Sequence, residues 1–180
     1  MTSVCVYMGS RDGDSPQWGE VAEHVGRRIA ERGWRLVYGG GNVGLMGRCA
    51  NGALSAGGEV IGIIPESLLQ LEAGHRSVTE LIQVPDMHTR KARMNTLSDG
   101  FIALPGGIGT FEELFEIWTW SYLALHRKPV AILNTNGFYT PLIEFLEKTA
   151  NHGFMSRETM DSLHVSDNID TLLDTMFGTQ

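Results

Sequence analysis

The sequence predicts an α/β protein whose core is a Rossmann-like, doubly wound parallel sheet with helices on both faces. Short apolar runs alternate along the chain with helical patterns, and right-handed crossovers then place the helices on both faces of a parallel sheet. Glycine-bearing loops follow three of these runs, at Gly9-Ser10, Gly39 to Gly47 and Gly106 to Thr110. Ligands of such sheets bind beyond the carboxyl ends of the strands, so the three loops predict one shared site.

Length and composition indicate a single domain over residues 1–180. The chain is long enough to bury a core, and 42% of its residues are hydrophobic. Its net charge of −7 argues against a nucleic-acid surface or an anionic membrane as partner. The sequence shows no secretory signal and no apolar run of membrane-spanning length, so we expect a cytoplasmic protein.

The elements follow in order from apolar periodicity and from start and stop residues. Ser15 and Pro16 form a favourable helix start, and Gly33 ends that helix. The predicted strands are Val4 to Met8, Trp34 to Tyr38, Glu59 to Ile64, Leu81 to Val84, Phe101 to Leu104 and Val130 to Leu133, with a short strand at His164-Val165. The predicted helices are Pro16 to Arg32, Gly47 to Ala56, a short one within Ser67 to Gly74, His88 to Ser98, Thr110 to His126, Tyr139 to Asn151, Arg157 to Leu163 and Ile169 to Phe177.

The stretch FIALPGGIGTFEELFE, Phe101 to Glu116, combines a buried strand, a glycine loop and a helix start. This order aims free backbone N–H groups at an anion, usually a phosphate. The same helix start carries the carboxylates Glu112, Glu113 and Glu116 within about one turn of that anion. A site that only bound phosphate would not favour carboxylates so close to the anion. They therefore indicate that a reaction takes place beside the phosphate.

A capping box is the alternative interpretation of this helix start. Thr110 to Glu113 matches T-x-x-E, in which Glu113 would return to the backbone N–H of Thr110. A phosphate in the loop would compete for the same N–H groups. Glu116 could simply lie on a solvated helix face.

The motif GGGNVG, Gly39 to Gly44, fits the dinucleotide fingerprint G-x-G-x-x-G. Glu59 lies at the wrong end of its strand to bind a ribose, and the motif follows the second strand rather than the first. We therefore favour a mononucleotide phosphate loop. A glycine-rich turn needed only for helix–sheet packing is the other interpretation.

His88 to Arg93 begins a helix with three cations, which oppose the helix dipole and so call for an anion or carboxylate partner. Arg90 can donate a planar fork to such a group, whereas an exposed face would explain the cations without one. Glu72 and His75 have helical spacing, but two ligands alone make a poor zinc site, so no metal is expected. Cys5 and Cys49 are interpreted as buried thiols.

Aromatic and apolar residues on the helix after the glycine loop exceed what a one-sided helix requires. They are Trp118, Trp120, Tyr122 and Leu125. Part of this surface is expected to form the seam of a homodimer, with plain core packing as the alternative.

These residues together resemble the LONELY GUY (LOG) family, cytokinin riboside 5′-monophosphate phosphoribohydrolases once labelled "lysine decarboxylase-like". The family pattern PGGxGTxxE is matched from Pro105 to Glu113, GGGxxGLMG from Gly39 to Gly47, MHxRK from Met87 to Lys91, and TW at Thr119-Trp120. The similarity spans nearly the whole chain at similar spacing. Arg93 and Gly100 depart from residues common in relatives, outside the signature positions.

The resemblance implies a Rossmann-like homodimer that binds a nucleoside 5′-monophosphate, with Arg90 and Glu113 as the catalytic pair and with no metal or redox cofactor. The residues expected to bind the substrate, from the loops and the resemblance together, are Gly9, Ser10, Gly40, Gly41, Gly44, Met46, Gly47, Glu72, Lys91, Gly106, Gly107, Ile108, Gly109, Thr110, Phe111, Glu112 and Thr119.

The implied reaction fits the carboxylates beside the phosphate site. Cleavage of the N-glycosidic bond of AMP, or of an N6-modified AMP, gives C1′ oxocarbenium character, which a carboxylate can stabilise. Glu113 is expected to do this and to orient the attacking water, while Arg90 fixes the phosphate or keeps Glu113 ionised. The alternatives are a non-catalytic nucleotide or molybdenum-cofactor carrier on the same fold and, from the old label alone, a decarboxylase, which the lack of a plausible cofactor lysine argues against.

Overall fold

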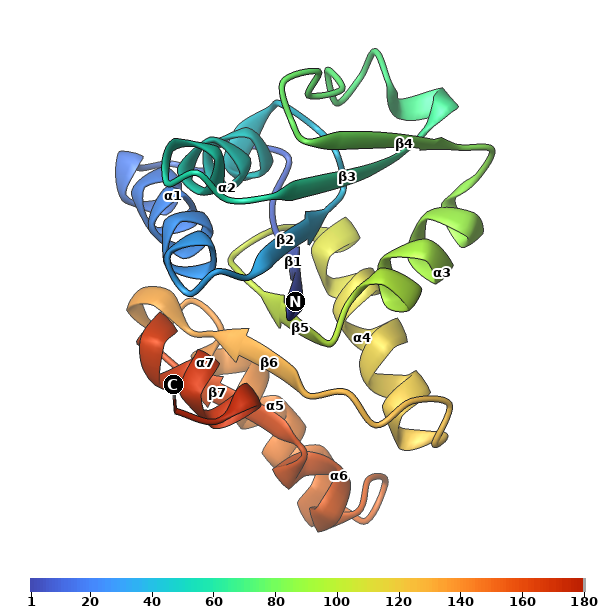
Figure 1. Ribbon diagram of the computed structural model, residues 1–180. Coiled ribbons are helices and arrows are strands. Elements are labelled where there is room, and N and C mark those ends of the chain that lie inside the picture. Colours follow the sequence, from blue (N-terminus) through green and yellow to red (C-terminus); the bar gives the residue numbers. More distant parts are fainter. Residues whose placement is uncertain (180) are drawn as a thin grey trace.

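One seven-stranded, wholly parallel sheet forms the centre of the computed structural model, which describes residues 1–179 (Figure 1). The strand order is β4-β3-β2-β1-β5-β6-β7, so the chain winds outward from β1 in one direction and then in the other. The strands are β1 (Ser3–Tyr7), β2 (Arg35–Tyr38), β3 (Val60–Pro65), β4 (Glu80–Val84), β5 (Gly100–Ala103), β6 (Val130–Leu133) and β7 (Leu163–Ser166). The predicted fold class is confirmed.

Helices cover both faces of the sheet, as the sequence predicts. In Figure 1, α1 (Pro16–Glu31), α2 (Gly44–Ser55) and α7 (Ile169–Phe177) lie on the left, and α3 (Met87–Leu97) and α4 (Ile108–Tyr122) lie on the right. The helices α5 (Thr140–Asn151) and α6 (Arg157–Asp161) extend the second group at the bottom of the view. Two short 3₁₀ turns, at Glu66–Leu68 and Thr135–Gly137, complete the elements.

Alternate side chains of each central strand enter two separate cores. Val4 and Val6 of β1 pack under α1, α2 and α7, while Cys5 and Tyr7 pack under α3 to α6. Because both faces are covered, the central strands are apolar at nearly every position rather than alternating. Cys5 and Cys49 are both buried free thiols, as predicted.

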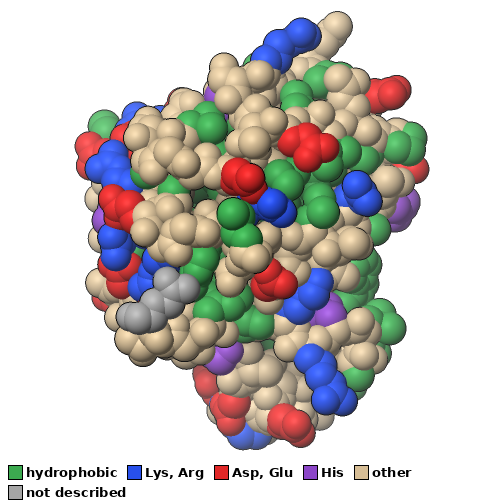
Figure 2. All heavy atoms as spheres, in the orientation of Figure 1, with side chains coloured by type: hydrophobic (Ala, Val, Ile, Leu, Met, Phe, Trp, Pro, Cys, Tyr) green, Lys and Arg blue, Asp and Glu red, His purple; other side chains and the backbone are tan. Residues whose placement is uncertain are grey.

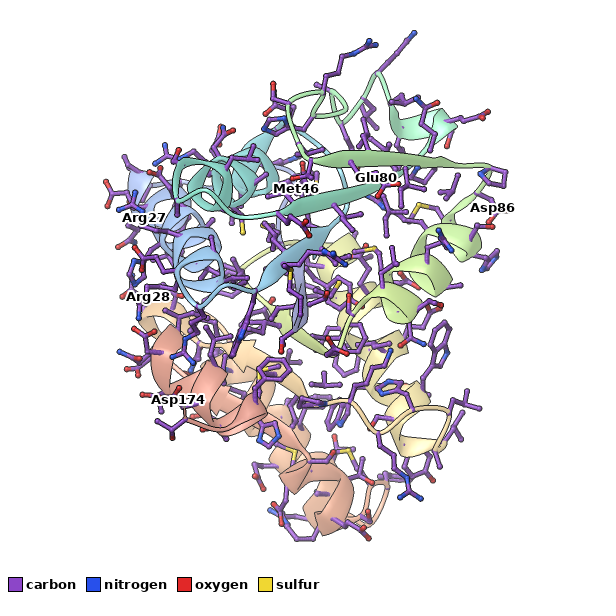
Figure 3. All side chains as sticks on the ribbon, viewed as in Figure 1. Arg27, Arg28, Met46, Glu80, Asp86 and Asp174 are labelled. Carbon is purple, nitrogen blue, oxygen red and sulfur yellow. The ribbon has the colours of Figure 1, made fainter. Side chains whose placement is uncertain are left out.

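Salt bridges fasten α7 to α1 on the left of the molecule. Arg28 pairs with Asp170 at 2.8 Å, and Arg32 pairs with Asp174 at 2.7 Å. Figure 3 labels Arg28 and Asp174 on this side, and Figure 2 shows basic and acidic side chains interspersed along the same edge. No helix within residues 1–179 is long and apolar enough to cross a membrane.

Most predicted boundaries agree with the structure to within about two residues. The helix α2 begins at Gly44, three residues before its predicted start, and the helix after the Gly106–Gly107 loop differs at both ends. It begins at Ile108 rather than Thr110 and ends at Tyr122 rather than near His126. The early end has a local cause, because Ala124 adopts a left-handed conformation and the N–H of Leu125 returns to the carbonyl of Trp120 at 2.9 Å. This is a Schellman motif, which closes a helix.

Candidate active site

A cavity of about 880 Å³ opens at the carboxyl ends of the central strands, between the loops that follow β1 and β5. These two strands are neighbours from which the chain winds in opposite directions, and ligands of doubly wound sheets bind at such a switch point. The volume falls within the range of small-molecule sites. Twelve of the expected substrate-binding and catalytic residues lie in its wall: Gly9, Ser10, Met46, Glu72, Arg90, Gly106, Gly107, Ile108, Gly109, Thr110, Glu112 and Glu113.

The N-terminus of α4 forms one wall of this cavity. Gly107 is the N-cap and supplies no side-chain cap, and the N–H groups of Ile108, Gly109 and Thr110 donate to no acceptor within residues 1–179. A Cβ added to Gly107 or Gly109 would meet no atom within 4 Å, so the backbone is open to the cavity. Unpaired amides at the positive end of a 15-residue helix are suited to bind an anion.

The capping-box interpretation of this helix start is wrong. Thr110 is the third residue of α4 rather than its N-cap, and its side chain is buried against Gly106. Glu113 therefore cannot complete a box with it, and instead lines the cavity one turn along the helix. The helix starts earlier because Gly107 takes the extended conformation that an N-cap requires.

Glu113 is partly buried and has no hydrogen-bond or ion-pair partner among residues 1–179. Removal from water raises the pKa of its carboxyl to about 7; the Arg90 guanidinium pulls that pKa down, while Glu112 and Glu72 push it up. A carboxyl with such a pKa can exchange a proton near neutral pH, as a general base must.

Arg90 is buried beside Glu113 and is held rigidly. Its Nε donates to the carbonyl of Ile63 at 3.0 Å, and its Nη2 donates to the carbonyl of Gly39 at 2.6 Å and to the Glu72 carboxylate at 2.9 Å. Among residues 1–179 its Nη1 contacts only the sulfur of Met87, at 3.8 Å, and so remains available to a ligand. The predicted carboxylate partner of the basic helix start thus exists, and it is Glu72.

Four glycines in and after the GGGNVG motif lie away from the cavity, although Gly39 lines it. Gly40, Gly41, Gly44 and Gly47 all lie outside its wall. Gly44 has φ +58, and a Cβ there would lie 2.3 Å from the backbone carbon of Ser10. At the N-terminus of α2, the N–H of Leu45 donates to the carbonyl of Gly9 at 3.1 Å. Close packing against the loop after β1 thus requires a glycine at position 44, in line with the packing interpretation of this residue.

Three further residues of the expected set also lie outside the cavity wall, namely Lys91, Phe111 and Thr119. Lys91 pairs with Glu112 and Glu116, while Thr119 is exposed on α4. Glu72 and His75 form no metal site, since His75 bonds to Asn51 at 2.9 Å. Among residues 1–179, no three His, Cys, Asp or Glu side chains are grouped to hold a metal ion.

The sequence reasoning missed one end of the cavity, which is aromatic and polar. Trp18 and Phe138 line it, with their rings edge to face at 5.8 Å, and Asp14 accepts from the Trp18 indole at 2.8 Å. The polar loop after β1 was the available signal, but nothing in the sequence indicates that Phe138, 120 residues after Trp18, lies against it. Gly39 was missed as well; it seats Arg90, because a Cβ there would lie 2.2 Å from Nη2.

Comparison with known proteins adds independent evidence. Residues 46–176 match the family model described as "Possible lysine decarboxylase". The chain is 50% identical to a cytokinin riboside 5′-monophosphate phosphoribohydrolase of Rhodococcoides fascians, over 93% of this chain and 85% of that protein. It is 46% identical to an Arabidopsis thaliana protein of the same name, over 85% of this chain and 70% of that one.

Among solved structures, a molybdenum cofactor binding protein from Rippkaea orientalis shares the fold. It has a TM-score of 0.73 and 25% identity, over 97% of this chain and 94% of that one. Identity to the phosphoribohydrolases is about twice as high. The chain therefore belongs to the "Possible lysine decarboxylase" family, and within it to the LONELY GUY phosphoribohydrolases.

Proposed function

We propose that this enzyme hydrolyses the N-glycosidic bond of adenosine 5′-monophosphate or its N6-modified forms, releasing the free base and ribose 5-phosphate. The observation that carries the proposal is the unpaired carboxylate of Glu113 one helical turn from the unpaired amides of Ile108 to Thr110. The names of relatives that share up to 50% of the sequence support the same reaction.

In the proposed binding mode the 5′-phosphate takes the amides at the N-terminus of α4, which places the ribose toward Glu113. Binding of the phosphate then holds the nucleotide in place and orients C1′ against the Glu113 carboxylate. Gly9, Ser10 and Gly106 complete this part of the wall.

The chemistry follows from the ionised form of Glu113. As the C1′–N9 bond breaks, its electron pair leaves with the base, and positive charge on C1′ is stabilised by the carboxylate. Glu113 orients a water and accepts its proton while the water oxygen bonds to C1′. The departing base gains a proton, so one water is consumed in all. Arg90 favours the charged form of Glu113 and presents Nη1 to the substrate.

We also propose a homodimer that uses the C-terminal end of α4. Trp118 is buried, so it belongs to the core, but Tyr122, Leu123 and Leu125 are each more than half exposed. Adjacent exposed apolar side chains of this size are typical of an interface. Sedimentation equilibrium tests this, with a mass of two chains expected for the wild type and of one chain for Leu125→Asp.

Product analysis tests the proposed reaction directly. Purified protein is incubated with AMP and, separately, with N6-isopentenyladenosine 5′-monophosphate, and the products are separated by chromatography. Equal amounts of free base and ribose 5-phosphate are expected. Tight nucleotide binding with no base released would contradict hydrolysis and favour a carrier of the kind that shares this fold.

A further inference from the structure

Four carboxylates gather where the turn after the Glu66–Leu68 segment, α3 and α4 meet, and three of them are paired. Glu72 pairs with Arg90 at 2.9 Å, and Glu112 and Glu116 both pair with Lys91, at 2.5 and 2.8 Å. Only Glu113 lacks a partner within residues 1–179. A single lysine thus pairs with both acidic neighbours of the proposed catalytic group and offsets one of their two negative charges.

Lys91 bridges α3 to α4 from outside the cavity. Its side chain is only 10% exposed, and two of its three N–H donors are taken by the carboxylates. Glu112 and Glu116 are four residues apart, so they share one face of α4, while Glu113 is rotated by about 100° from Glu112. Glu112 and Glu113 line the cavity, whereas Glu116 and Lys91 do not. The lysine therefore contacts the back of the site rather than its interior.

We propose that Lys91 is a positioning residue: its two ion pairs hold Glu112 and Glu116 on the α3 side and leave Glu113 as the unpaired carboxylate that faces the substrate. The proposal rests on the proposed function, and it differs from the expectation that Lys91 contacts the substrate. Burial opposes the charge on Lys91, but its hydrogen bonds to Glu112 and Glu116 outweigh burial and raise its pKa overall, so it stays cationic.

The charged and titratable groups around Glu113 explain why this lysine matters. On α3 they are Arg90 and Lys91, on α4 Glu112 and Glu116, after β3 Glu72, and on β1 the buried Tyr7 and Cys5. Without Lys91, one more negative charge of the Glu112–Glu116 pair would act on Glu113 uncompensated and would raise the pKa of the Glu113 carboxyl. Without Glu112 and Glu116, an uncompensated cation would do the reverse.

Variants with opposite expected signs test this. Lys91→Met is expected to move the acidic limb of the kcat/KM profile up by roughly one pH unit. The double variant Glu112→Gln/Glu116→Gln, which keeps Lys91, is expected to move it down. Combining all three substitutions removes one positive and two negative charges, so the limb is expected to lie between its positions in the double variant and the wild type, and Lys91→Arg is expected to stay near the wild type.

A direct titration makes the result independent of activity. The Glu113 carboxyl is followed against pH by ¹³C NMR in each variant and assigned by its disappearance in Glu113→Gln. Shifts with the signs given above are expected even if the protein turns over no nucleotide, so failure of the proposed function is distinguishable from failure of this inference.

Unchanged Glu113 titrations in Lys91→Met and in the double variant would overturn the proposal. A raised KM without a shifted pH limb, persisting in the triple variant, would instead make Lys91 a substrate contact. If Lys91→Met fails to fold, the double and triple variants decide instead. The absence of a downward shift of the acidic limb in the double variant would contradict the proposal.

Discussion

At the scale of single residues, the unusual feature is a carboxyl that the fold leaves without a partner. Glu113 has a pKa of about 7 because it is removed from water, and the nearby Arg90 only partly offsets that removal. Arg90 itself is neutralised by Glu72 and fixed by two carbonyls. Burial of Glu113 therefore lowers the stability of the fold, and it gives the site a group that can exchange protons at neutral pH.

We therefore expect Glu113→Gln to raise the free energy of unfolding in a pH-dependent way. The native state holds the Glu113 proton more tightly than the unfolded chain does, so ionisation destabilises the wild type increasingly as pH rises from about 4.5 to 7. Glutamine has no such cost. We expect the variant to match the wild type near pH 4.5 and to exceed it by roughly 1–3 kcal/mol at pH 8.

Urea unfolding at both pH values measures this difference. Glu144→Gln is the matched control, because Glu144 is an exposed carboxylate on α5 with no ion pair among residues 1–179. A difference between Glu113→Gln and the wild type that is the same at both pH values would contradict the assigned environment of Glu113.

The sequence predicted which residues form the site far better than it predicted the residues with which they pair. The pattern around Arg90 and Glu113 indicated an anion and a carboxylate, and both residues line the cavity. That Glu72 is the partner of Arg90 follows only from the packing of the segment after β3 over the end of β2, which no local pattern encodes.

At the scale of elements, two glycines before α4 have different structural roles. A Cβ on Gly106 would lie 2.1 Å from Thr110 Oγ1 and 2.9 Å from the Gly9 nitrogen. A Cβ on Gly107 would meet no atom within 4 Å, and its φ of −105° suits any residue. Gly106 is therefore required by packing, and Gly107 by access to the backbone.

Alanine substitutions separate the two tasks. We expect Gly106→Ala to lower the free energy of unfolding by about 1–3 kcal/mol, because the loop must shift. Gly107→Ala is expected to change stability by less than about 0.5 kcal/mol but to weaken AMP binding, since its methyl group projects where the phosphate approaches. Calorimetric titration with AMP and thermal unfolding test both, and unaltered AMP affinity in Gly107→Ala would contradict the anion site.

The same helix shows where sequence reasoning fails. T-x-x-E is a sound capping signal, yet α4 begins two residues before Thr110, with Gly107 at the N-cap position and no capping side chain. A capping side chain and an anion site need the same N–H groups, so a functional helix start departs from the local rule. At the other end, the left-handed Ala124 could not be foreseen, since alanine favours continuing a helix.

At the scale of the whole molecule, alternating strands and helices predicted the parallel sheet, which the fold confirms, and a ligand site at the carboxyl ends of its strands, where the cavity lies. The strand order was not predictable, because it depends on which direction each crossover takes along the sheet. That order makes β1 and β5 neighbours and so joins the loops after them into one cavity. Trp18 and Phe138 contribute to the cavity wall because of this strand order. Their contribution was missed because the order could not be predicted.

The central claim is that the α4 amides hold a nucleotide so that its ribose lies against Glu113, and Glu113→Gln tests it most directly. The variant should bind AMP as the wild type does, while kcat for release of the base falls by about 10²- to 10⁴-fold, and Glu144→Gln should leave both unchanged. A crystal structure of Glu113→Gln with AMP should place the phosphate on the N–H groups of Ile108 to Thr110 and C1′ beside residue 113. Base release at the wild-type rate, or a ribose bound away from residue 113, would contradict the claim.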